Sequence, residues 1–126
     1  MKKENKKITE LVKTFEDARK LTGRPDVPDF SNLPTDMRKH FEAQYKMIVI
    51  AEALNEGWIP DWNNYNEYKY YPWFEMSPSS FAFDDSDYAS AYASAGSGSR
   101  LKFRTLELAN YAAEQFIDIW KDIQIG

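Results

Sequence analysis

The sequence predicts an α+β fold: two N-terminal helices, a three-stranded antiparallel sheet and a C-terminal helix packed on one sheet face. Three observations lead to this prediction. Apolar residues recur every three or four positions before residue 57 and after residue 105, which is helical spacing. Between residues 68 and 104 they alternate with polar residues, as in half-buried strands. The length of 126 residues is typical of one domain, so we expect residues 1–126 to form a single domain.

The first helix is predicted over Ile8–Leu21. Its apolar positions are Ile8, Leu11, Val12, Phe15 and Ala18. Gly23 then supplies a stop signal, and the prolines that follow it keep the helix from resuming. Thr14 followed by Asp17 is also a capping pattern, which leaves open a shorter helix that starts inside this stretch. Residues 1–7, rich in lysine, are expected to form a disordered tail.

The second helix is predicted from Pro34 to a C-terminal cap at Gly57. Proline suits the first helical position, and Asp36 in the first turn interacts favourably with the helix dipole. The run Met47–Ile50 is apolar on all sides of the helix. We therefore expect this helix to be the central one.

The next segment is aromatic: 12 of the chain's 20 aromatic residues lie between Trp58 and Tyr92. A first strand is predicted over Tyr68–Met76, and Pro72 marks it as an edge strand or a bulged one, because proline cannot donate to a ladder. Strand alternation separates two rows of side chains. The inner row, expected to pack on the helices, comprises Tyr68, Tyr70, Phe74, Phe81 and Phe83, and the outer row of the first strand comprises Lys69, Tyr71, Trp73 and Glu75.

The remaining elements follow from shorter patterns. Phe81–Phe83 begins a second strand, which the aspartates after it are expected to interrupt, and residues 84–99 are expected to form a flexible loop rich in Ala, Ser and Gly. Arg100–Arg104 is predicted as the third strand, with Leu101 and Phe103 inside and the three basic residues outside. Thr105 caps a final amphipathic helix.

Composition excludes several classes of function. There is no cysteine, so disulfides, thiolate metal sites and a cysteine nucleophile are excluded. A net charge of −4 argues against bulk binding to a polyanion. No apolar signal-peptide core follows the N-terminus, and the longest apolar run, Met47–Ala51, is far shorter than the roughly 20 residues of a membrane helix. We expect a soluble cytoplasmic protein without a membrane partner.

Candidates for catalysis and metal binding are weak. His40 is the only histidine, and a lone helical histidine is more often structural than catalytic. The segment Asp84–Asp87 offers oxygen ligands but does not fit the calcium-loop spacing, because the sixth and twelfth positions counted from Asp85 are Ser90 and Gly96. The glycines at 96 and 98 precede a predicted strand, whereas a phosphate-binding loop precedes a helix. No cofactor, metal or catalytic residue is therefore expected.

The candidate binding site is the outer face of the predicted sheet. Its residues are Lys69, Tyr71, Trp73, Arg100, Lys102 and Arg104. Cationic and aromatic side chains on one sheet face are the usual means of binding single-stranded nucleic acid. Exposed rings are equally typical of protein interfaces, and a solvated face without function is the plainest alternative. Trp58 and Trp62, which flank Pro60 at the exit of the second helix, are expected to fill the junction between helix and sheet.

Two segments resemble a known group of proteins. They are Ala51–Trp62 with Glu67–Phe74, and Ser99–Ala109 with Tyr111, Gln115, Phe116, Trp120, Lys121 and Asp122. Together they are similar to a family of small uncharacterised proteins encoded by gut-type Bacteroidetes, their phages and prophages. The resemblance implies an origin in a phage or mobile element, and a cytoplasm that is bacterial or phage-infected. It implies no activity, cofactor or catalytic residue.

The sequence as a whole favours a small non-enzymatic protein that acts by binding a protein partner. Nucleic-acid binding through the same aromatic and basic face is the alternative. An enzyme that uses aspartate or glutamate in an aromatic pocket has the least support, because nothing in the spacing selects a pair of carboxylates. The oligomeric state is left open.

Overall fold

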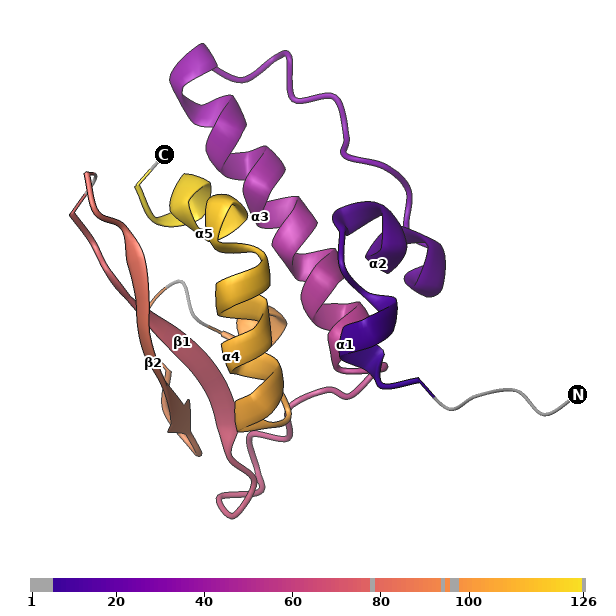
Figure 1. The fold of residues 1–126 in the computed structure, drawn as a ribbon, viewed down its shortest axis with the longest axis vertical. Coiled ribbons are helices and arrows are strands. Elements are labelled where there is room, and N and C mark those ends of the chain that lie inside the picture. Colours follow the sequence, from indigo (N-terminus) through magenta and orange to yellow (C-terminus); the bar gives the residue numbers. More distant parts are fainter. Residues whose placement is uncertain (1–5, 78, 94, 96–97, 126) are drawn as a thin grey trace, which may run out of the picture.

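The computed structural model describes residues 6–77, 79–93, 95 and 98–125, and these form an α+β fold (Figure 1). Within these ranges there are five α-helices, one short 3-10 helix and two strands. In chain order they are α1 (Ile8–Leu11), α2 (Phe15–Thr22), α3 (Thr35–Leu54), β1 (Lys69–Glu75), β2 (Ala82–Ala89), the 3-10 helix η1 (Ser99–Leu101), α4 (Leu106–Gln115) and α5 (Ile117–Gln124).

Helix α3 is central, as predicted from its apolar run. Helices α1 and α2 lie on one side of it, and α4 and α5 lie between it and the β1–β2 hairpin (Figure 1). The buried core draws on α3, η1, the segment after η1, α4 and α5. Its largest members are Met47, Val49, Ile50, Leu54, Leu101, Phe103, Leu108, Phe116 and Trp120.

The prediction of one continuous helix over Ile8–Leu21 is wrong, because the chain breaks between α1 and α2. Thr14 is extended at the start of α2, and its hydroxyl accepts the Asp17 N–H at 3.1 Å. The Asp17 carboxylate in turn accepts the N–H groups of Thr14 and Lys13 at 3.2 and 3.0 Å. This reciprocal capping box satisfies donors that a continuous helix would need for its own ladder, so it starts a new helix at Phe15.

The C-terminal helix is also divided. Thr105 caps α4 as predicted, since its hydroxyl accepts the Leu108 N–H at 3.1 Å. At Phe116 the backbone leaves helical geometry, with φ −114° and ψ 32°, and α5 starts at the next residue. The indole N–H of Trp120 donates to the Ala112 carbonyl at 3.1 Å. The Ala112 carbonyl also accepts the Phe116 N–H at 3.1 Å, so the indole adds a second hydrogen bond that ties α5 to α4 across the break.

The predicted three-stranded sheet is a two-stranded antiparallel hairpin. Of the expected third strand, only Phe103 pairs with β1, through two hydrogen bonds with Tyr70 of 2.9 and 2.7 Å. Pairing does not extend towards Leu101, because Ser99–Leu101 forms the 3-10 helix η1 and Pro72, two residues after Tyr70, has no N–H to donate. The side chain of Asn55 binds the opposite side of this segment. It donates to the Lys102 carbonyl at 2.9 Å and accepts the Arg104 N–H at 3.0 Å, on either side of Phe103. Leu101 and Phe103 are nevertheless buried, as predicted.

Strand β2 runs through the aspartates that were expected to end it. It spans Ala82–Ala89, so the predicted loop of residues 84–99 cannot begin before residue 90. The side chains of Asp84, Asp85 and Asp87 are exposed, and a half-solvated strand tolerates charge on that side. The predictions for residues 1–5, 78, 94, 96 and 97 lie outside the described residues.

Pro72 occupies a position in β1 that suits a residue without an N–H. The neighbouring Tyr70 bonds to Phe103, so even-numbered backbone groups near this point face away from β2, and Pro72 costs the hairpin no hydrogen bond. The register shifts between Trp73 and Phe74, but the extra residue there is Asp84, so the bulge that was expected in β1 lies in its partner β2. In the predicted inner row, Tyr70, Phe74 and Phe81 pack against the core and Phe83 is half-buried, whereas the assignment of Tyr68 is wrong because it is 45% exposed.

Candidate functional site

The outer face of the β1–β2 hairpin carries two aromatic rings opposite two carboxylates. The strand register pairs Tyr71 with Asp87 and Trp73 with Asp85, and cross-strand partners lie on the same face. Trp73 is 54% exposed and Tyr71 is half-buried, with 6.1 Å between their ring centroids. These four residues are referred to below as the aromatic–acidic patch.

The two carboxylates of the patch are turned to solvent. Each uses one oxygen on its own strand: Asp85 accepts the Ser86 N–H at 2.8 Å, and Asp87 accepts the Tyr88 N–H at 2.7 Å. Neither forms an ion pair with a cation in the part of the chain that the structure describes. Burial, and after it the charge of Asp87, raises the pKa of the Tyr71 phenol above its ordinary value. The patch is therefore negative at neutral pH.

Lys69 was predicted to lie on the exposed outer row, and this is wrong, because its side chain is fully buried. Its Nζ donates to the backbone carbonyls of Asn64 and Ser90 at 2.9 and 3.0 Å. The Glu67 carboxylate lies 3.5 Å away, and the centroid of the Trp62 ring 5.1 Å away. A buried ammonium needs such partners, so Lys69 joins the loop before β1 to the segment after β2.

Lys102 was likewise expected outside and is fully buried. Its Nζ lies 4.4 Å from the centroid of the Tyr71 ring, within the range of a cation–π contact. Burial lowers the pKa of Lys102 to about 8. Lys102 does lie beside the outer row, as expected, but it supports the Tyr71 ring from within and offers no charge to solvent.

The two arginines are exposed as predicted, yet they do not join the patch. The Arg104 guanidinium forms an ion pair with Glu56, next to the end of α3. Arg100 lines a cavity together with Arg24 and Trp58, whereas Tyr71 and Trp73 line a different one. The basic row that the sequence suggested does not form, and the aromatic pair is flanked by acid instead.

A cavity of about 480 Å³ adjoins the aromatic–acidic patch. Its walls come from β1, α3 and the C-terminal end of α5, and they include Tyr71, Trp73, Met76, His40, Gln44 and Ile123. The Oε1 atom of Gln44 is buried and has no hydrogen-bond partner in the described structure. An unpaired buried carbonyl oxygen is costly, so Gln44 lowers the stability of the fold at this point.

His40 and the two N-terminal tryptophans of the aromatic run have structural contacts. The Nδ1 atom of His40 lies 2.9 Å from the Ile123 carbonyl, which ties α3 to α5. Trp58 and Trp62 are half-buried, and their indole N–H groups donate to Glu67 at 3.1 Å and to the Ser99 hydroxyl at 2.6 Å. These contacts are consistent with the packing role expected for the tryptophans.

Within the described ranges, no group of three or more histidine, aspartate and glutamate side chains is placed to hold a metal ion. None of the helices in the described structure combines the length and the apolar character needed to cross a membrane.

Sequence reasoning missed Asp85, Asp87 and Gln44 as members of this surface. A signal for the aspartates existed, since they are two residues apart, which is the period of one strand face. No local pattern singles out Gln44, because its unpaired oxygen depends on what α5 and β1 place around it.

Comparisons of the chain with protein-family models, with curated proteins and with solved structures give no match. The function therefore has to be inferred from the residues and their geometry.

Proposed function

We propose that this protein acts without catalysis, by binding a protein partner through the aromatic–acidic patch. The segment of the partner that docks there carries lysine or arginine. The observation that carries this proposal is the exposed ring of Trp73 directly opposite the Asp85 carboxylate. The resemblance of the sequence to proteins of Bacteroidetes and their phages supports a place in a phage or mobile-element programme, in the cytoplasm.

Three features of the patch favour a cationic side chain. The face of an exposed tryptophan attracts an ammonium or a guanidinium within about 6 Å, and arginine stacks on it best. The carboxylates of Asp85 and Asp87 lie on the same face and lack a described cationic partner. An arginine that stacks on Trp73 can donate to either carboxylate, and a charge-assisted hydrogen bond is about twice as strong as a neutral one.

The adjoining cavity favours a protein segment over a free cation. Its apolar walls, among them Met76 and Ile123, can receive the aliphatic part of a neighbouring side chain. A peptide supplies apolar groups and donors at fixed spacing, so it can use the patch and the cavity together.

Nucleic-acid binding, the alternative reading, has less support from this geometry. Lys69 and Lys102 are buried, and Arg104 is paired with Glu56. The carboxylates of Asp85 and Asp87 beside the rings would repel phosphates. Bases that stack on these rings without neutralisation of their phosphates would lack the electrostatic contribution that dominates affinity for nucleic acid.

A peptide panel tests the proposal. Short fluorescent peptides share one apolar sequence and differ only in carrying arginine, glutamine or glutamate at two positions, and their binding is measured by anisotropy at low salt. We expect the arginine peptide to bind most tightly and the glutamate peptide not to bind. Trp73→Ala and the double change Asp85→Asn with Asp87→Asn should each weaken binding of the arginine peptide by about tenfold or more, since each removes about 1–3 kcal/mol.

Matched variants control for surface aromatics and for charge. Tyr92→Ala removes a ring that is 89% exposed and outside the patch, and Asp118→Asn removes an exposed carboxylate on α5. Both should leave binding unchanged. If the glutamate peptide binds as well as the arginine peptide, or Trp73→Ala binds as well as Tyr92→Ala, the proposal is wrong. Salt-sensitive binding to single-stranded oligonucleotides that is lost in Arg100→Ala would favour the alternative instead.

A further inference from the structure

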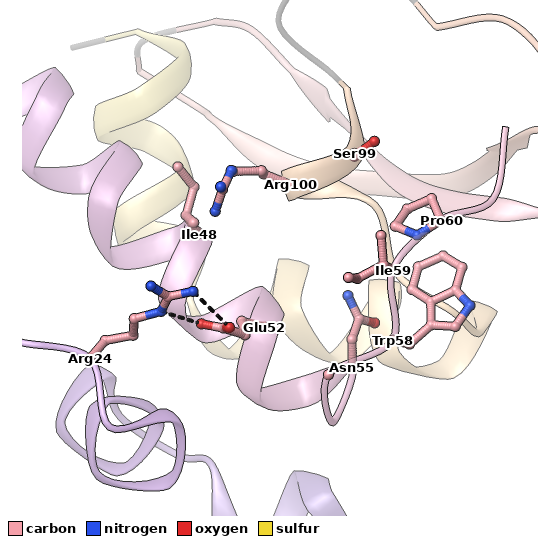
Figure 2. A pocket seen from close by; sticks show the side chains of 10 residues that line it. Arg24, Ile48, Glu52, Asn55, Trp58, Ile59, Pro60, Ser99 and Arg100 are labelled. Carbon is pink, nitrogen blue, oxygen red and sulfur yellow. Dashed lines mark hydrogen bonds and ion pairs between the residues drawn. The ribbon is translucent and has the colours of Figure 1, made fainter.

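Another cavity, separate from the one beside the aromatic–acidic patch, lies between α3, the segment that follows it and η1 (Figure 2). Its volume is about 290 Å³. One wall is made by Ile48 and Glu52 of α3, with Arg24 reaching in from the connector after α2. The opposite wall is the segment Gly57–Pro60, and Arg100 of η1 closes the top of the view.

The charges in this cavity leave a net positive group. Arg24 forms a two-point contact with Glu52, with Nε–Oε1 at 2.8 Å and Nη2–Oε2 at 3.0 Å, so these two charges neutralise each other. This hydrogen bonding with Arg24, followed by the charges of Arg24 and Arg100, holds the pKa of Glu52 below its usual range. The Arg100 guanidinium is turned towards Ile48 and Glu52 (Figure 2), and it forms no hydrogen bond or ion pair with a described residue. Arg100 is thus the uncompensated cation.

Ser99, beside Arg100 on the same turn, also lines the cavity, and its hydroxyl accepts the indole N–H of Trp62 at 2.6 Å. In Figure 2 this hydroxyl points away from the Arg100 guanidinium, so Arg100 is the group placed to bind an anion.

The opposite wall is apolar and open to solvent. Ile59 is 78% exposed, and it lines the cavity together with Trp58 and Pro60. An isoleucine left in water next to a hollow gains about 1.5–3 kcal/mol when something covers it fully. The cavity is at the lower end of the range for ligand pockets, about 300–1,000 Å³, so it suits a small molecule and not a nucleotide.

We propose that this cavity binds a small organic carboxylate with an apolar body. The carboxylate meets Arg100, and the apolar body covers Ile59 and lies against Pro60. A guanidinium binds a planar carboxylate with two parallel hydrogen bonds. An inorganic anion could accept hydrogen bonds from Arg100 but has no apolar body to contact Ile59. This site is independent of the aromatic–acidic patch, because its charge is opposite and its residues are different.

A charge series of one small molecule tests the proposal. The probes are 3-phenylpropionate, its neutral amide 3-phenylpropanamide and the cation 3-phenylpropylamine, with acetate as the anion that lacks the ring. Binding is followed by amide chemical shifts in two-dimensional NMR of the full chain in low salt. We expect 3-phenylpropionate to bind with shifts centred on Ser99, Arg100 and Ile59, and each of the other probes to bind at least tenfold more weakly.

Two variants at the cavity move affinity in opposite directions. Arg100→Gln removes the uncompensated cation and should weaken binding of 3-phenylpropionate by about tenfold to hundredfold. Glu52→Gln removes the like charge and releases Arg24, so it should strengthen binding several-fold. A merely structural role for Glu52 would not produce that gain. Arg104→Gln is the matched control, since it removes one exposed arginine that pairs with Glu56 and does not line the cavity.

The outcomes separate cleanly. Equal binding of the carboxylate and the amide would overturn the proposal, because the site would then recognise only the apolar body. Equal losses in Arg100→Gln and Arg104→Gln would also overturn it, because the effect would be one of net charge. If 3-phenylpropionate does not bind, the result expected from the peptide panel and Trp73→Ala is unchanged, so the two proposals are tested independently.

Discussion

Lys69 and Trp73 belong to the same outer row of β1 but differ in burial. Lys69 is fully buried and donates to two backbone carbonyls, whereas Trp73 is 54% exposed beside a carboxylate. Both were predicted to face solvent, since strand alternation gives them the same face. The difference shows that alternation assigns a face, whereas burial depends on which segments later cross that face.

Removal of Lys69 should have the largest effect on stability. Lys69→Ala deletes a fully buried stem and leaves the carbonyls of Asn64 and Ser90 without their donor, so we expect a loss of about 3–4 kcal/mol in the free energy of unfolding. Lys69→Met keeps the stem and removes only the ammonium, and about half of that loss should remain. Urea denaturation followed by circular dichroism measures both.

The control for this variant is Lys20→Ala, which removes an exposed lysine of α2 and should change stability by less than about 0.5 kcal/mol. If Lys69→Met were as stable as the unaltered protein, the buried ammonium would not be joining the two segments. The hydrogen bonds of Lys69 would then not explain why it is buried while Trp73 is exposed.

The difference between Lys69 and Trp73 also shows which features of the fold could be predicted from the sequence. The helix around Met47, the cap at Thr105 and the inward direction of Phe103 were predictable, because neighbouring residues determine them. The burial of Lys69 was not, because its partner carbonyl at Ser90 lies 21 residues further along the chain. The contacts of the Asn55 side chain could not be predicted for the same reason, since Asn55 binds backbone groups 47 and 49 residues away.

The candidate site follows the same division. Tyr71 and Trp73 were identified from alternation within one strand. Their acidic neighbours were not, because the identity of the residue opposite Trp73 depends on the register, and consecutive aspartates predict an interruption of the strand. Arg100 was predicted to lie in the same binding face, but it belongs to η1 and lines a cavity that no local pattern predicts.

The pH dependence of stability tests whether the Lys102 ammonium is buried. Its folded pKa of about 8 lies below the unfolded value near 10.4, so the unfolded chain binds more protons between these values. The free energy of unfolding should therefore rise as pH increases from about 8 towards 9.5, by about 1–2 kcal/mol. Denaturation at a series of pH values should show this rise in the unaltered protein and not in Lys102→Met.

The pH range of this test matters, because burial raises the pKa of Tyr71 and Tyr111 above 10. A raised folded pKa means that stability falls as pH passes the unfolded value, which would oppose the lysine effect above about pH 10. A flat profile between pH 8 and 9.5 would mean that Lys102 keeps its ordinary pKa and that its ammonium is not buried in solution.

Trp73 should show the smallest effect on stability and, with it, the sharpest contrast with Lys69. Its ring is more than half exposed and lies 6.1 Å from the Tyr71 ring between centroids, so Trp73→Ala should cost less than about 1 kcal/mol in the free energy of unfolding. The same change should reduce binding of the arginine peptide by about tenfold or more. Denaturation and anisotropy on one preparation measure both quantities. A residue that loses binding without losing stability belongs to a surface kept for a partner, whereas a loss above about 2 kcal/mol would place Trp73 with Lys69 among the residues that hold the hairpin together.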